Sequence, residues 1–186
     1  MANWSRNRGI MRKTAFNVLH VRARSGPKTR GVLIAGQLAL PVALGRAGIR
    51  ANKHEGDGAT PRGRFKLRRL WWRPDRGPRP RTLLPLRPIR PEDAWSEDPA
   101  DRRYNRPVRR SAGKSGDRLW RNDRLYDLII ELDHNFRPRV AGRGSAVFVH
   151  VARPGFAPTA GCVALKPGAL RQLIAHLGPR TRIDIR

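Results

Sequence analysis

The sequence predicts a mainly β, single-domain protein with a β-sandwich or barrel-like fold, one late helix and a long irregular insertion. The chain has 186 residues, which suits one domain of about 100–200 residues. Short apolar runs are separated by turns rich in glycine and proline, a pattern typical of strands. One segment near the C-terminus instead repeats its apolar residues at the helical period.

The first part of the domain is expected to contain four strands and one loop. Apolar runs predict strands at residues 16–23, 32–35, 38–44 and 65–72. Because proline cannot donate to a strand ladder, Pro41 predicts that the third strand is an edge strand or is bulged. Residues 53–63 hold three glycines and one proline, which predicts a loop without a regular element.

The least regular part of the sequence is the insertion, about residues 73–118. It contains eight prolines and many charged residues, so it forms either one long loop or several short pieces. A segment of this kind inside a compact domain is usually functional or mobile. It could act as a lid over a site.

The last part of the domain is expected to hold three strands and the single helix. Strands are predicted at residues 126–132, 145–151 and 182–186, and a turn at residues 134–144. The helix is predicted at about residues 167–177, because four apolar residues recur there at the spacing of one helix face: Leu170, Leu173, Ile174 and Leu177. Pro167 suits its first turn, and Gly178 ends it.

The chain is strongly basic, with a formal charge of +26 that comes mostly from 34 arginines. Clustered positive charge is typical of nucleic-acid binding, but these arginines are spread along the whole chain and accompany no known nucleic-acid-binding pattern. We therefore expect no specific nucleic-acid partner. The charge still predicts attraction to polyanions, including anionic envelope polymers.

The single cysteine, Cys162, excludes an intramolecular disulfide framework and a cysteine-rich zinc module. The five histidines show no spacing typical of a metal site, so no metal is expected. No apolar run is long enough to predict a transmembrane segment.

The N-terminal residues 1–14 are predicted to be a basic tail that could be disordered, followed by the domain at residues 15–186. The tail lacks the apolar run of a secretory signal. Residues 31–45 are mostly apolar, but Gln37 and Pro41 interrupt them, and two buried strands explain them better. No signal peptide is therefore visible.

One stretch, residues 145–165, combines residues that can carry chemistry. A predicted strand ends near His150, and Cys162 follows twelve residues later in a turn that contains Gly161. A nearby imidazole lowers the pKa of a thiol and so activates it as a nucleophile. The backbone N–H groups of Gly161 and Cys162 could stabilise an oxyanion. On spacing alone, a buried thiol and a structural histidine explain the pair as well.

Several separated motifs of the chain occur together, in order, in one known family. His150 is followed by a loop and then by Thr159-Ala160-Gly161-Cys162, which matches a signature of His, a loop and Ser/Thr-x-Gly-Cys. Residues 55–65 match a Gly-Asp-Gly-x-Thr-Pro-x-Gly-x-Phe stretch. With further similarity at Trp95, 98–99, 104–105, 125–127, 134–135 and 144–150, the chain resembles the L,D-transpeptidase catalytic domain (YkuD family) of peptidoglycan cross-linking enzymes.

Two departures from the family pattern bear on the site. Ala160 stands where the commoner version has a histidine, and the loop between His150 and Cys162 is shorter. Both differences concern the preferred acceptor and the groups that orient His150. They leave the nucleophile and the base in place.

The resemblance implies a cysteine acyltransferase that acts on peptidoglycan stem peptides without a metal or organic cofactor. Cys162 would attack the carbonyl before the terminal D-alanine of a stem tetrapeptide, with His150 as general base and then acid. The Cys162 thioester would pass to an amine of a neighbouring stem, or to a free D-amino acid or water. The substrate implies a periplasmic or cell-envelope location, although the missing signal peptide leaves a cytoplasmic one open.

Two alternatives stay open at this point. The same site could serve a hydrolase (L,D-carboxypeptidase, endopeptidase or amidase) that gives the thioester to water. Alternatively, the chain could be a non-catalytic basic module that binds a polymer or nucleic acid.

Five further residues are candidates for substrate binding, each with a structural alternative. Thr159 matches the family signature, but its hydroxyl could simply hold a turn. His134 and Asn135 could line the pocket or shape their own turn, and Ser145 could do either. Arg153 could bind a substrate carboxylate or be a solvated surface charge.

Overall fold

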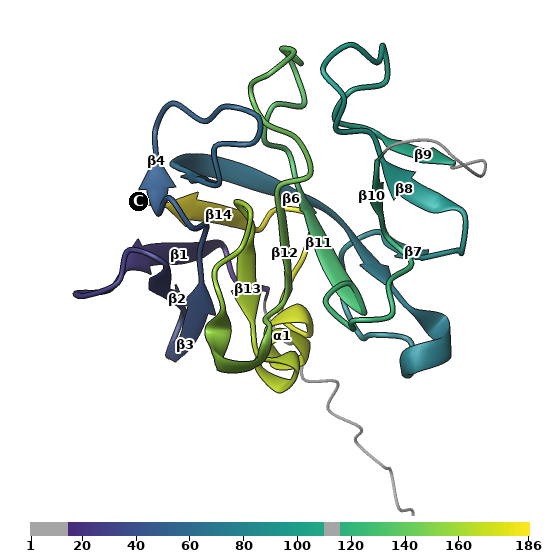
Figure 1. The fold of residues 1–186 in the computed structure, drawn as a ribbon. Helices are drawn as coiled ribbons and strands as arrows, with labels where there is room; N and C mark the ends of the chain where they lie inside the picture. Colours follow the sequence, from purple (N-terminus) through teal and green to yellow (C-terminus); the bar gives the residue numbers. More distant parts are fainter. Residues whose placement is uncertain (1–14, 110–115) are drawn as a thin grey trace, which may run out of the picture.

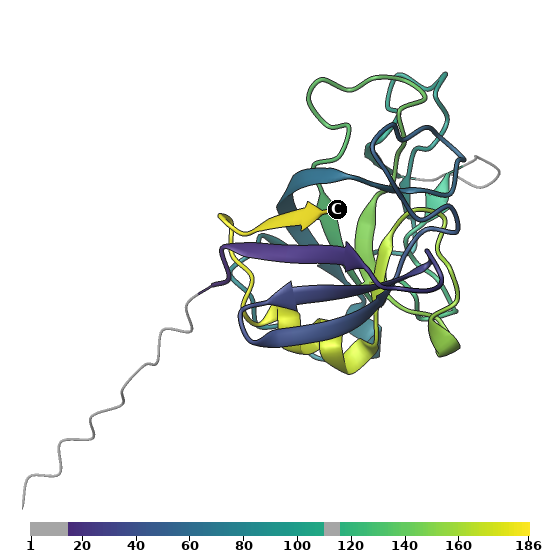
Figure 2. The same ribbon diagram turned by 90° about the vertical axis from the view of Figure 1, so that its left-hand side faces the viewer.

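The computed structural model describes residues 15–109 and 116–186 (Figures 1 and 2). Residues 1–14, predicted to be a basic tail, lie outside this description. In the described part, nine strands form the main sheet in the order β11-β12-β13-β3-β2-β1-β14-β6-β7. Because β11 also pairs with β6, the first eight of these strands close into a barrel. The mainly β, barrel-like prediction is confirmed.

The strands of the barrel agree with the predicted segments, with ends that move by up to three residues. They are β1 (Val18–Ala23), β2 (Arg30–Ala35), β3 (Leu38–Ala43), β6 (Gly63–Trp72), β11 (Leu128–Leu132), β12 (Phe148–Val151), β13 (Val163–Leu165) and β14 (Arg182–Ile185). The sequence reasoning named no strand at residues 163–165. Its three buried residues are too few to show a period.

Pro41 has a partner strand on only one side. It pairs with Val32 of β2, and the β2–β3 register runs without a bulge. On the other side, β13 pairs only with Val42 and Ala43 of β3. The prediction of an edge strand is therefore correct for the position of Pro41. The strand β3 as a whole lies inside the sheet.

The predicted loop at residues 53–63 contains one short paired segment. Its end forms β5 (Thr60–Pro61), which pairs in parallel with β4 (Ile49–Arg50). Backbone hydrogen bonds from Thr60 to Gly48 and from Arg62 to Arg50 hold this pair. The prediction of no regular element was wrong for these residues, because the pairing is set by a distant segment.

The insertion consists of several short pieces rather than one loop. After a short 3-10 turn (Pro74–Arg76) come β7 (Leu86–Pro88), β8 (Asp93–Trp95), β9 (Pro107–Arg109) and β10 (Asp117–Arg118). β7 extends the main sheet beyond β6, and the other three form a small sheet in the order β10-β8-β9. Figure 1 shows this small sheet beside the barrel.

The late helix α1 (Pro167–Ile174) lies at the lower end of β13 in Figure 1. It ends three residues earlier than predicted. The N–H groups of His176 and Leu177 bond to carbonyls three residues back, which tightens the chain into a final turn. Leu177 is still fully buried, so the apolar pattern correctly marked the core but not the helix end. No described helix is long and apolar enough to cross a membrane.

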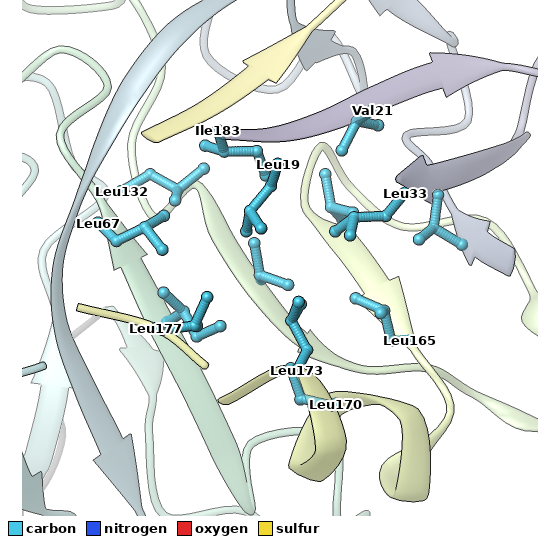
Figure 3. Packing of buried hydrophobic residues seen from close by; sticks show 14 of the residues in the cluster. Leu19, Val21, Leu33, Leu67, Leu132, Leu165, Leu170, Leu173, Leu177 and Ile183 are labelled. Atoms are coloured by element: carbon cyan, nitrogen blue, oxygen red, sulfur yellow. The ribbon is translucent and has the colours of Figure 1, made fainter. Parts of the chain in front are cut away.

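The alternation of side chains along the strands produces two separate apolar clusters. Inside the barrel, side chains from strands and α1 meet, including Leu19, Leu33, Leu165, Leu173 and Ile183 (Figure 3). On the opposite face of β6, β11 and β12 lies a second cluster, which we call the outer cluster. It combines strand residues with residues of the insertion: Trp71, Ile89, Trp95, Leu119, Leu125, Tyr126, Ile129, Ala146, Phe148 and Cys162.

Candidate active site

The strand register places Cys162 and His150 on the same face of the barrel. β12 and β13 are parallel neighbours, with Val149 opposite Val163 and both in the barrel core. Since side chains alternate along a strand, the flanking residues Phe148, His150 and Cys162 face the outer cluster. The Phe148 N–H donates to Cys162 Sγ at 3.4 Å, in agreement with this placement.

Cys162 and His150 line one cavity of about 900 Å³. The cavity also takes Tyr126 from the loop before β11, and Glu97 and Asp117 from the insertion. Both candidate catalytic residues are nearly buried, with 8% of Cys162 and 6% of His150 exposed. The insertion therefore supplies part of the wall beside the thiol.

The thiol and the imidazole each form a hydrogen bond with a backbone carbonyl. Cys162 Sγ donates to the carbonyl of Ala146 at 3.2 Å. His150 Nδ1 lies 2.8 Å from the carbonyl oxygen of Val151. Because a carbonyl can only accept, Nδ1 carries the proton of this contact, and Nε2 of a neutral ring is left as the base nitrogen. No direct Cys162–His150 hydrogen bond is present among the described residues.

Burial keeps both groups neutral. It raises the pKa of the Cys162 thiol to about 12, although the hydrogen bond from the Phe148 N–H opposes this. It lowers the pKa of His150 to about 4, against the hydrogen bond to Val151. Removal from water disfavours the charged form of each group. These shifts favour a neutral thiol and a neutral imidazole rather than the expected thiolate beside an imidazole.

The turn before Cys162 requires glycine and uses the hydroxyl of Thr159. Gly161 has a φ of +147°, and a Cβ there would lie 2.8 Å from the carbonyl oxygen of Ala59. Thr159 Oγ1 accepts from the Gly161 N–H at 3.1 Å and donates to the Cys162 carbonyl at 2.7 Å. Its hydroxyl therefore has the turn-holding role, although Thr159 also lines the cavity.

This turn leaves one of the two expected oxyanion donors available. The Gly161 N–H is engaged by Thr159. For the Cys162 N–H, we find no acceptor among the described residues. The position of Ala59 also explains why the glycine-rich stretch at residues 55–65 accompanies the Cys162 turn, because its backbone packs directly against Gly161.

Comparison with known proteins identifies the family of the domain. Residues 28–185 match the family model of the L,D-transpeptidase catalytic domain, YkuD. The chain belongs to this family. No curated protein and no solved structure was found to match it. Membership of the YkuD family makes the chain an L,D-transpeptidase-type enzyme that modifies peptidoglycan, which implies a location in the cell envelope.

Two of the substrate-binding candidates do not line the cavity of this YkuD domain. His134 Nε2 lies 3.0 Å from the carbonyl oxygen of Arg143. The Asn135 side chain donates to the carbonyls of Val140 and Gly144 and accepts from the Val140 N–H. Both residues hold the turn before β12. They therefore shape their own turn and do not line the pocket.

Ser145 and Arg153 line the cavity, as Thr159 does. Ser145 lines it with a buried hydroxyl that has no hydrogen-bond partner among the described residues. Arg153 lines it as well, and its guanidinium makes no ion pair or hydrogen bond with the described residues. An unpaired guanidinium in the cavity suits a carboxylate ligand.

Sequence reasoning assigned no role to Asn105, which orders the backbone around the thiol. Its buried amide accepts from the Trp95 indole at 3.0 Å and from the Ala146 N–H at 3.2 Å. The same amide donates to the carbonyls of His134 and Asn135. Asn105 thus links the insertion to Ala146, whose carbonyl accepts the thiol proton. Asn105 belongs to the matched segment at residues 104–105, and this similarity could have indicated that it has a role in the site.

The cavity also contains charged residues to which sequence reasoning gave no role. Tyr126 donates to Asp117 at 2.5 Å, and its ring centroid lies 5.3 Å from that of His150. Arg121 donates to the other Asp117 oxygen at 3.2 Å. These groups come from the insertion and the segment after it, so only the folded chain brings them into the cavity that Cys162 lines.

Proposed function

We propose that this chain is a cysteine-dependent L,D-transpeptidase that acts on peptidoglycan stem peptides through a Cys162 thioester. The supporting observation is that Cys162 and His150 share one face and one cavity in a YkuD domain. The cavity adds an unengaged backbone N–H at Cys162 for an oxyanion. We place this activity in the periplasm or cell envelope, where its substrate lies.

Acylation starts from the neutral pair in this proposal. His150 Nε2 removes the thiol proton as Cys162 Sγ attacks the carbonyl before the terminal D-alanine. The Cys162 N–H donates to the developing oxyanion. When the tetrahedral intermediate collapses, the C–N bond breaks and His150 gives its proton to the leaving D-alanine. Arg153 binds the carboxylate of that D-alanine.

Transfer reverses these roles. An amine attacks the thioester carbonyl, the new C–N bond forms, and the C–S bond breaks. The departing sulfur regains a proton through His150. If water replaces the amine, the same steps give hydrolysis, so the acceptor decides between a cross-linking enzyme and a carboxypeptidase.

The low pKa of His150 predicts an unusual pH profile for acylation. A general base must be neutral, and burial lowers the pKa of this imidazole to about 4. We therefore expect the acylation rate to stay near its plateau down to about pH 5, below the pH where an ordinary histidine of pKa about 6.5 would protonate. Acylation rates measured between pH 4 and 8 test this, and an acidic limb between pH 6 and 7 would contradict it.

The test of the proposed function is covalent labelling followed by product analysis. The protein is incubated with a carbapenem, its intact mass is measured, and the adduct is mapped by peptide mass spectrometry. We expect one adduct on Cys162. Purified muropeptides then show the outcome: cross-linked dimers support the proposal, and trimmed monomers alone indicate a hydrolase. Absence of both labelling and turnover would indicate a non-catalytic binding module.

A further inference from the structure

Three carboxylates line the same cavity as Cys162, and two of them have partners. Glu55 accepts from the Tyr104 hydroxyl. Asp117 accepts from Tyr126 and Arg121. Glu97 makes neither a hydrogen bond nor an ion pair with any described residue. It follows β8 in the insertion and is partly buried.

The positive groups of the cavity are mostly engaged elsewhere. Lys53 pairs with Asp57 at 2.6 Å, and Arg121 pairs with Asp123 and Asp117. Arg46 donates to the carbonyl of Gly56 at 2.9 Å. Arg153, the remaining cation that lines the cavity, makes no ion pair with Glu97. In a chain of 40 basic and 14 acidic residues, Glu97 is therefore a cavity carboxylate without an ion-pair partner among the described residues.

A second polar group in the cavity lacks a partner. The hydroxyl of Ser145 is buried, and the residue is 8% exposed. It makes no hydrogen bond of ordinary geometry among the described residues; its polar neighbour is the Tyr104 hydroxyl, which donates to Glu55. A buried polar group without a partner is unfavourable by about 1–3 kcal/mol. An ammonium group supplies a positive charge and three donors, so it can satisfy both an anionic carboxylate and a hydroxyl oxygen.

We propose that Glu97 binds the ammonium group of the acyl acceptor and takes its first proton, so that the free amine can attack the Cys162 thioester. This assignment rests on the proposed transpeptidase function and names the acceptor class, a primary amine that arrives as a cation. Ser145 accepts a second hydrogen bond from the same ammonium group.

The proton balance of this step is complete. The acceptor R–NH₃⁺ gives one proton to the Glu97 carboxylate and becomes R–NH₂. The amine nitrogen attacks the thioester carbon, and its second proton passes through His150 to the departing sulfur. The products are an amide and the Cys162 thiol, and Glu97 returns its proton to solvent.

The surroundings of Glu97 suit proton exchange near neutral pH. Burial, helped by the negative charges of Asp117 and Glu55, raises the pKa of Glu97 to about 7, and Arg121 opposes this shift. A general base works best when its pKa lies near the working pH. The acceptor amine is the stronger base of the two, because even the α-amino group of a peptide titrates at about 8. Proton transfer to Glu97 is therefore unfavourable by at least about one pKa unit, which still permits exchange.

The experiment compares Glu97→Gln with the wild-type protein and with Asp98→Asn. Asp98 is exposed, lies one residue away and does not line the cavity. Its Oδ1 accepts from the Ala100 N–H, a bond that asparagine keeps. Each protein receives a disaccharide-tetrapeptide muropeptide as donor and D-methionine as acceptor. Formation of the acyl-enzyme, its aminolysis and its hydrolysis are measured separately.

We expect Glu97→Gln to slow aminolysis by about 100-fold, while the hydrolysis of the acyl-enzyme is unchanged. Acylation should stay at the wild-type rate or rise slightly, because the negative charge of Glu97 disfavours the Cys162 thiolate. The rise of the aminolysis rate around pH 7 should be lost in Glu97→Gln and kept in Asp98→Asn.

Different failures have different meanings in this design. If the wild-type protein forms no acyl-enzyme with the muropeptide, the proposed function fails, and the role of Glu97 with it. If the acyl-enzyme forms and Glu97→Gln partitions it as the wild type does, only the acceptor assignment is overturned. If Glu97→Gln slows acylation and leaves the partition unchanged, Glu97 serves the donor, and the assignment is again overturned.

Discussion

Replacing Cys162 by serine is expected to reduce acylation by a carbapenem or by a muropeptide by at least about 1,000-fold. A serine hydroxyl can make the same two contacts, to the Ala146 carbonyl and from the Phe148 N–H, so the fold should be kept. A hydroxyl is much harder to deprotonate than a thiol. The base available is a neutral imidazole oriented by the Val151 carbonyl rather than by a carboxylate.

The measurement is the rate at which the intact mass increases by one adduct. Thermal unfolding of Cys162→Ser shows whether the domain is intact, and Asp98→Asn serves as a variant that leaves the site untouched. Acylation of Cys162→Ser at the wild-type rate would show that the sulfur is not the nucleophile. It would then leave the proposed thioester without support.

The part of the site that the sequence predicted depends on local signals. The alternation along residues 147–151 decides that Val149 and Val151 face the barrel core, so His150 must face the other way. The glycine before Cys162 correctly indicated a tight turn, which the φ of Gly161 confirms. Strand alternation and turn chemistry act over a few residues, and the sequence shows them directly.

What could not be predicted depends on contacts between distant segments. The neutral state of Cys162 was not predicted, because the outer cluster, which includes Trp95 from the insertion and Leu119 just after it, buries the thiol and raises its pKa. No sequence pattern around Glu97 indicated a function. Its proposed role in acceptor binding depends on the cavity, to which the insertion contributes part of the wall. His134 and Asn135 belong to a matched motif, but they act on the backbone of their own turn.

The strand pairing within the insertion also depends on contacts that the sequence does not reveal. The prolines of the insertion predicted either one long loop or several short pieces, and two of these prolines, Pro88 and Pro107, lie within paired strands. They gave no indication that β8, β9 and β10 form a sheet of their own. The edge-to-face contact of Trp95 with Phe148, at 5.0 Å between centroids, joins that sheet to β12 and so places Glu97 in the cavity that Cys162 lines.

Replacing Glu131 by alanine is expected to destabilise the domain by about 3 kcal/mol. Glu131 is fully buried on β11, opposite Arg69 of β6, where the pairing of these two strands closes the barrel. Its carboxylate forms ion pairs with Arg68 and Arg69 and accepts from the Trp71 indole at 3.1 Å. Alanine would leave two guanidinium groups and a buried indole N–H without their acceptor.

The size of this effect follows from the exposure of the partners. Breaking a fully buried ion pair destabilises a protein by about 3–5 kcal/mol. Here 22% of the Arg68 side chain and 31% of the Arg69 side chain are exposed, so water can partly replace the carboxylate, and the lower end of that range applies. For a domain of this size, the melting temperature should fall by roughly 6–12 °C.

Unfolding in urea provides the measurement, with Glu92→Ala as the matched control, because Glu92 has no ion pair or hydrogen bond among the described residues. The control should change stability by less than about 0.5 kcal/mol. Glu131→Gln keeps an oxygen for the Trp71 indole but loses the charge, so its stability should lie between those of the wild type and Glu131→Ala. Equal stability of all four proteins would show that the barrel closes without this ion pair and that the β6–β11 backbone ladder is sufficient.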